Sequence, residues 1–170
     1  MNIFWLLAFL LASCTGIPKG MKPVDGFDVN RYVGTWYEIA RLDQRFEKGL
    51  DNISAHYSLA NDGGLEVLNQ GQNLETGEWK KAEGKAYFIE QPTVGRLKVS
   101  FFGPFYGSYN IIALDKQNYQ YSMVTGPNRS YLWILARTKT LPKKILDALI
   151  EDAKKQGFDT GKLIRVKQKE

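Results

Sequence analysis

Apolar and polar residues alternate with a period of two in eight stretches of the chain between residues 35 and 138. The stretches are 35–42, 53–60, 65–72, 79–89, 96–102, 108–115, 119–125 and 131–138. Such alternation is typical of strands with one buried face. Turn residues at 61–64 and 75–78 separate neighbouring stretches by short links, which favour antiparallel up-and-down order. The pattern therefore predicts an all-β fold, an eight-stranded up-and-down antiparallel barrel.

The period changes after residue 138. Thr140, Leu141 and Pro142 open a predicted helix that runs to about Gln156, with Thr140 capping its first amides and Gly157 ending it. Its apolar positions form one stripe, so we expect this helix to pack on the outside of the barrel.

The first residues carry an export signal. Residues 3–11 are almost wholly apolar, which is too short for a membrane span, and Leu-Ala-Ser then leads into Cys14, the only cysteine. This junction resembles a bacterial lipobox, so we expect cleavage of residues 1–13 and lipidation of Cys14. Thr15 then favours sorting to the outer membrane. No Lys or Arg precedes the apolar run, which leaves open an ordinary secretory signal followed by a free cysteine.

Cleavage of residues 1–13 from the 170 leaves 157, the size of one domain. Residues 14–26 contain three glycines and two prolines, and we expect a flexible tether there. Residues 27–170 form the folded domain. The net charge of +5 is dispersed and is compatible with anionic lipid headgroups, whereas nucleic acid is not expected for an exported chain.

Catalytic or metal-binding chemistry is not indicated. The single histidine, His56, falls on the polar face of its strand, opposite Ala55 and Tyr57. The carboxylates of Glu38 and Glu83 could in principle act together, but nothing in the sequence brings them close. With Cys14 lipidated, the sequence contains no Cys/His pair, and we expect no catalytic residue, no metal and no cofactor.

The apolar strand faces predict the inside of the barrel. Several of these positions are small, namely Gly71, Ala82, Gly84, Ala86 and Ala113, which favours a cavity over a filled core. The alternative is that the large rings simply pack the core. The predicted ligand-binding residues, apolar with a few polar groups, are Tyr57, Asn69, Phe88, Val99, Phe101, Tyr106, Tyr109 and Trp133.

Gly34 directly precedes the first predicted strand, Trp36 lies at the start of that strand, and Arg137 lies at the end of the last. Gly34 permits close approach, so the Arg137 guanidinium is the best candidate to stack on the Trp36 indole where the barrel closes. This pairing resembles the signature of the lipocalins, in particular of their bacterial and apolipoprotein D branch. Further blocks of the resemblance follow in order: Phe27–Asn30, Ala55–Leu59, Val67–Gln70, Phe101–Gly107 and Trp133–Arg137.

The resemblance implies further features. The long piece 43–51 would lie over the open end of the barrel, and Leu163–Val166 would add a short strand beside the first one. Tyr57, Asn69, Tyr109 and Trp133 match positions that line the cavity in the apolipoprotein D branch.

The resulting hypothesis is a non-enzymatic lipid-binding module. It would sit at the bacterial outer membrane, facing the periplasm, and hold a fatty acid or lysophospholipid; a homodimer is left open. Two alternatives remain: an enzyme that modifies lipids or isoprenoids within the same barrel, and a structural envelope-stress protein whose cavity is incidental.

Overall fold

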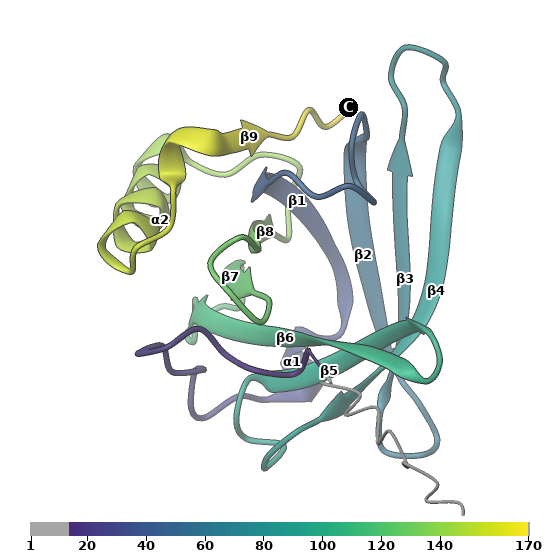
Figure 1. The fold of residues 1–170 in the computed structure, drawn as a ribbon, viewed down its shortest axis with the longest axis vertical. Helices are drawn as coiled ribbons and strands as arrows, with labels where there is room; N and C mark the ends of the chain where they lie inside the picture. The colour runs from purple at the N-terminus through teal and green to yellow at the C-terminus, as the bar shows by residue number, and fades with distance from the viewer. Residues whose placement is uncertain (1–13, 170) are drawn as a thin grey trace, which may run out of the picture.

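The computed structural model describes residues 14–169, and the predicted signal at 1–13 lies outside them. The elements follow the predicted order (Figure 1). They are α1 (Val29–Tyr32), β1 (Gly34–Leu42), β2 (Asp51–Leu59), β3 (Leu65–Gln72), β4 (Trp79–Phe88), β5 (Arg96–Phe102), β6 (Phe105–Leu114), β7 (Tyr121–Thr125), β8 (Leu132–Ala136), α2 (Lys143–Lys155), the 3-10 turn η1 (Thr160–Lys162) and β9 (Leu163–Arg165).

The eight strands β1 to β8 close on themselves. Each strand pairs antiparallel with the next, and β1 pairs with both β2 and β8. The predicted up-and-down antiparallel barrel is confirmed. β9 lies outside the closed barrel and pairs antiparallel with the end of β1, as the resemblance implied.

The up-and-down order places alternate connections at opposite ends of the barrel. We define the open end by the connections 43–50, 73–78, 103–104 and 126–131, and the closed end by α1 and the connections 60–64, 89–95 and 115–120. The turn at 103–104 is tighter than expected, because Phe102 and Phe105 pair across it and extend β5 and β6 toward the tip.

Arg137 and Trp36 pack together at the closed end, as predicted. The guanidinium carbon lies 4.0 Å from the centre of the fully buried indole. Gly34 has φ +101, and a Cβ there would lie 3.2 Å from Arg137 Nη1, so glycine serves both the backbone conformation and the close approach. Arg137 also donates hydrogen bonds to the carbonyl oxygens of Thr35 and Tyr32, at 3.0 Å each.

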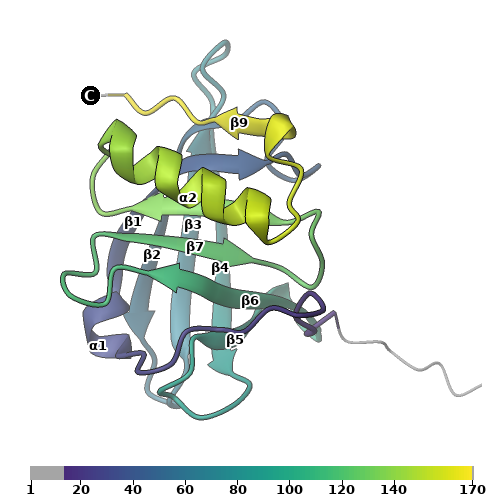
Figure 2. The same ribbon diagram turned by 90° about the vertical axis from the view of Figure 1, so that its left-hand side faces the viewer.

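Helix α2 covers one outer face of the barrel (Figure 2). Leu149 and Ala153 pack against the outward side chains of β1, β7 and β8 and form a second core. The expected cap is wrong, because Pro142 occupies the N-cap position and no side chain caps the helix. Neither helix in the described part of the chain has the length and apolar character needed to cross a membrane.

The expected tether at 14–26 is not a free linker. It runs along the barrel: Ser108 N donates to Cys14 O at 2.8 Å, and Val24 N donates to Ile111 O at 2.9 Å. Met21 is buried in the core beneath α2. Glycine and proline discourage regular structure in this segment, but other backbone groups of the segment still pair with β6 and with Gly95.

Trp36→Ala should lower the free energy of unfolding by about 3–5 kcal/mol, because it deletes a fully buried ring and uncovers the Arg137 cation. Chemical denaturation measures this. Tyr37→Ala, on the outer face of the same strand, is the matched control. A loss below about 1 kcal/mol for Trp36→Ala would contradict the role of this pair in closing the barrel.

Candidate functional site

The strand register identifies which side chains face the barrel interior. Trp36 pairs with Ala55, Ala55 with Asn69, and Asn69 with Ala82. Cross-strand partners share a face, so the whole row points inward with the buried indole of Trp36. Ala82 is nevertheless exposed. Solvent therefore reaches the inner face of β4 at this height.

Most of the predicted ligand-binding residues share this interior. Tyr57 belongs to the inner core, and Phe88, Val99, Tyr109 and Trp133 are partly buried against it. Their partial exposure on an inward face is compatible with a lumen that is not filled by side chains.

Phe101 and Asn69 also belong to the interior. The Phe101 ring lies over Gly84, where an added Cβ would be 2.7 Å from Phe101 Cδ1, and the ring remains 39% exposed. Asn69 Oδ1 is buried and accepts no hydrogen bond from the described residues. A buried acceptor without a donor is costly, so this oxygen is suited to a polar group of a guest molecule.

Tyr106 does not lie beside the other predicted ligand-binding residues. Its ring stacks beneath the Lys98 ammonium at 4.7 Å and lies 6.4 Å from the Tyr87 ring. Lys98 is next to the inward Val99 and so points outward. The expected place of Tyr106 at the ligand is therefore wrong; the ring lies on the outside, close to the β5–β6 turn.

The expected inward position of Ala113 is also wrong. A bulge in β6 between Ile111 and Ala113 shifts the alternation by one residue. Ile111 packs in the interior, whereas Ala113 packs in the outer core beneath α2 and Leu114 returns to the inside.

Three tyrosine hydroxyls form a chain inside the barrel. Tyr109 Oη lies 2.7 Å from Tyr32 Oη and accepts a hydrogen bond from Tyr57 Oη at 3.0 Å; Ser122 Oγ lies 3.3 Å from Tyr32 Oη. Burial raises the pKa of Tyr32 to about 12 and raises the pKa values of Tyr57 and Tyr109 as well. These hydroxyls stay neutral and act as hydrogen-bond donors and acceptors rather than as bases.

A charged cluster that the strand pattern does not predict lies on the inner face of β1. Arg41 is 2% exposed and donates to Glu38 Oε1 at 3.2 Å. Its Nε lies 4.0 Å from Glu47 Oε2, the oxygen that accepts from Trp133 Nε1 at 3.1 Å. A bulge between Glu38 and Ala40 turns Arg41 inward, which strict alternation does not predict. The charged neighbours of Glu38 are therefore Arg41 and Glu47, and not Glu83.

This cluster also holds the connection 43–50. Arg41 Nη2 donates to the backbone oxygens of Glu47 at 3.1 Å and Leu50 at 3.3 Å. Burial raises the pKa of Glu38 well above its usual range and also raises the pKa of Glu47. Arg41 Nη2 also lies 3.3 Å from Asp43 Oδ1, so one cation faces three carboxylates, and Glu38, the most buried of the three, is favoured in its protonated form.

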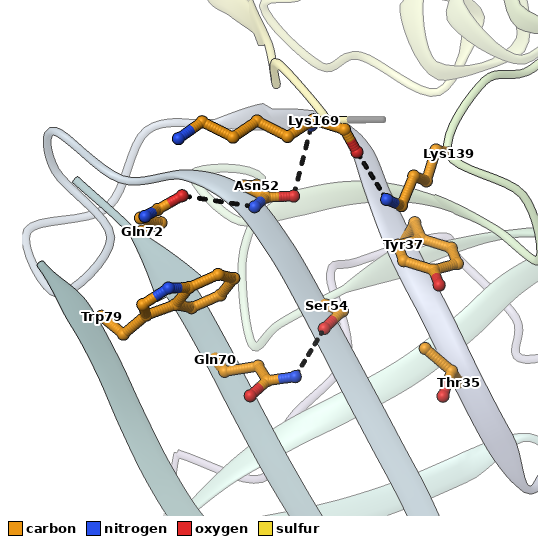
Figure 3. Close-up of a pocket in the computed structure, with 9 residues that line it drawn as sticks. All are labelled: Thr35, Tyr37, Asn52, Ser54, Gln70, Gln72, Trp79, Lys139 and Lys169. Carbon is orange, nitrogen blue, oxygen red and sulfur yellow. Dashed lines mark hydrogen bonds between the residues drawn. The ribbon is translucent and has the colours of Figure 1, made fainter. Parts of the chain in front are cut away.

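A separate depression of about 530 Å³ lies on the outside of the barrel (Figure 3). The side chains in it come from the outer faces of β1 to β4, from the connection between β8 and α2, and from the C-terminal segment. They are Thr35, Tyr37, Asn52, Ser54, Gln70, Gln72, Trp79, Lys139 and Lys169. This polar depression is distinct from the inward-facing residues above.

His56 also lies outside, as predicted, exposed and with Nδ1 2.9 Å from Thr35 Oγ1. Within residues 14–169, no group of three His, Cys, Asp or Glu side chains is placed to hold a metal ion.

Glu38→Gln should flatten the dependence of stability on pH. A carboxyl whose pKa is raised by folding stabilises the protein fully below its unfolded pKa, and this contribution is lost as pH rises through the folded pKa. The parent should therefore lose stability from about pH 5 toward pH 8 more steeply than the variant. Urea denaturation across this range tests it, with the exposed Glu83→Gln as control; parallel curves for parent and Glu38→Gln would refute it.

Comparisons with known proteins agree with this geometry. The lipocalin-like domain family model matches residues 27–168. The outer membrane lipoprotein Blc of Vibrio cholerae is 56% identical over 163 residues, covering 96% of this chain and 95% of that protein. The Blc protein of Escherichia coli is 52% identical, covering 95% and 92%. Apolipoprotein D of Macaca fascicularis is 35% identical, covering 91% and 82%.

Solved structures show the same fold. Insecticyanin from the tobacco hornworm Manduca sexta matches with a TM-score of 0.73 at 23% identity, covering 91% of this chain and 88% of that one. The family match over most of the chain and the relatives at 52–56% identity, taken with the closed barrel and its Trp36–Arg137 pair, show that this chain belongs to the lipocalin family.

Proposed function

We propose that this chain is a non-enzymatic binding protein for a single-chain lipid, a fatty acid or a lysophospholipid, anchored to the outer membrane and facing the periplasm. The observation that carries the proposal is the inner face of the barrel: apolar and aromatic side chains that keep partial exposure, with one buried polar acceptor without a donor. An acyl chain gains about 0.8 kcal/mol for each buried methylene, so such a lining needs no further specific contacts to hold it.

The ligand would lie with its tail against Phe88, Val99, Phe101 and Trp133 and its polar end near Tyr57, Asn69 and Tyr109. Asn69 Oδ1 requires a donor. A glycerol hydroxyl of a lysophospholipid supplies one, whereas an ionised fatty acid carboxylate only accepts. This chemistry favours the lysophospholipid.

The anchor would be an acyl-modified Cys14. Cys14 is exposed at the start of the described residues, and close relatives carry the name outer membrane lipoprotein. Two or more acyl chains give stable attachment to a membrane, which one chain does not.

Ala82→Trp should weaken lysophospholipid binding by about tenfold or more, about 1.4 kcal/mol, because the indole occupies ligand volume on the inner face, beside Asn69. Calorimetric titration below the critical micelle concentration measures this, with circular dichroism to confirm folding. Lys81→Trp adds the same ring to the outer face of the same strand and should bind like the parent. Equal affinity of the folded Ala82→Trp variant and the parent would place the lipid elsewhere.

Cys14→Ser should move the protein out of the outer-membrane fraction or leave it unprocessed, because serine cannot take the thioether-linked lipid. Fractionation of cells, with mass spectrometry of the mature N-terminus, tests this. A variant that is processed normally and still sediments with the outer membrane would overturn the anchor.

A further inference from the structure

Exposed phenylalanine side chains gather at the tip of the β5–β6 hairpin. Phe102 is 82% exposed and Phe105 is 67% exposed, and the two pair across the turn at 103–104. Two neighbouring rings held in water by a tight turn are an unusual surface for a soluble domain, and they mark a site of contact with an apolar partner.

The backbone of Cys14 lies against the same hairpin. Cys14 pairs with Gly107, two positions after Phe105, and Ser108 N donates to Cys14 O at 2.8 Å. Asn110 Nδ2 donates to Gly16 O at 3.1 Å and holds the following residues along β6. The acyl chains of a lipidated Cys14 would therefore start beside the phenylalanine tip rather than at the end of a long tether.

The hairpin belongs to the open end of the barrel. The connection 43–50 is at this end too, and it carries Phe46 at 65% exposure. At the closed end of the described chain, Leu59 is the large apolar side chain with comparable exposure, 55%. Apolar exposure is thus concentrated where the lumen opens.

Behind the tip, the outer face of the hairpin suits the headgroup layer of a membrane. The Lys98 ammonium lies over the Tyr106 ring at 4.7 Å. Lysine and tyrosine combine an apolar body with a polar end and are favoured at membrane interfaces, whereas phenylalanine enters the acyl region. Along the hairpin, Lys98 and Tyr106 lie nearer the barrel, and Phe102 and Phe105 lie at the tip.

We propose that the tip of the β5–β6 hairpin inserts Phe102 and Phe105 into the same leaflet that holds the acyl chains of Cys14, so that the open end of the barrel faces the membrane. The proposal rests on the proposed anchor. It deepens the proposed function, because a lipid leaving the leaflet would meet the mouth of the barrel directly. The occupant of this surface is a lipid bilayer.

The orientation is tested on the lipidated protein in vesicles of phosphatidylethanolamine and phosphatidylglycerol. Since Cys14 is the only cysteine and its thiol is acylated, Phe102→Cys introduces a single free thiol for an environment-sensitive fluorophore. Its emission should rise about twofold or more and should be quenched by lipids brominated in their acyl chains. The same fluorophore on Leu59→Cys, at the closed end, should stay in water.

Equal responses from the two positions, or no quenching at residue 102, would overturn the proposal. A rise in emission at residue 102 that depends on protein concentration and not on lipid would show a second copy of the chain on the tip, and would overturn it too.

A second measurement separates this proposal from lipid binding in the barrel. In the unlipidated Cys14→Ser protein, the pair Phe102→Ser and Phe105→Ser should reduce vesicle binding by about tenfold or more, whereas Leu59→Ser should not. Binding of monomeric lysophospholipid should be the same in all three proteins. Unchanged vesicle binding in the double variant refutes the docking surface alone, whereas unchanged lysophospholipid binding in the Ala82→Trp variant refutes the barrel site alone.

Discussion

The closure of the barrel through β1 is the constraint on which the rest of the structure depends. β1 pairs with β2 on one side and with β8 on the other, so no other strand completes the cylinder. Arg137, directly after β8, covers the Trp36 ring and donates to backbone oxygens at the start of β1. The cation thereby joins the last strand to the first and fills the closed end. The positions of the side chains inside the barrel depend on the pairing of β1 with β2 and β8.

Two bulges then decide what lies inside. The bulge in β1 places Ile39 and Ala40 in the core beneath α2 and turns Arg41 into the barrel, where its guanidinium lies against Glu38, Asp43 and Glu47. The bulge in β6 moves Ala113 to the outer core in the same way. A β-bulge reverses which side chains of a strand point inward and which point outward. In β1 and β6 this reversal supplies apolar side chains to the outer face beneath α2.

The two ends of the barrel therefore differ in chemistry. The closed end is tightly packed around Trp36, while the open end combines the charged cluster at Arg41 with exposed phenylalanines on the connection 43–50 and at the tip of the β5–β6 hairpin. The N-terminal segment runs along β6 and places Cys14 near the open end. With the proposed anchor at Cys14, this arrangement would couple the direction of the opening to the position of the anchor.

The sequence by itself determined the features that depend on local pattern. Period-two alternation and turn residues predicted all eight strands and their order, the helical stripe predicted α2, and the lipocalin signature identified the Trp36–Arg137 contact. His56 was correctly placed outside by the same alternation. Alternation also predicted which side chains point inward wherever a strand is regular, as for Tyr57 and Asn69.

Only the tertiary structure decided the rest. A bulge is a property of a strand pair and not of one strand, so alternation could not bring Arg41 inward or turn Ala113 outward. The place of Tyr106 depends on how β5 and β6 pair near their turn. The course of residues 14–26 depends on free backbone groups along β6 that the composition of the segment does not reveal. In each case the deciding interaction joins residues far apart in the sequence, and a local pattern contains no information about which partner it will meet.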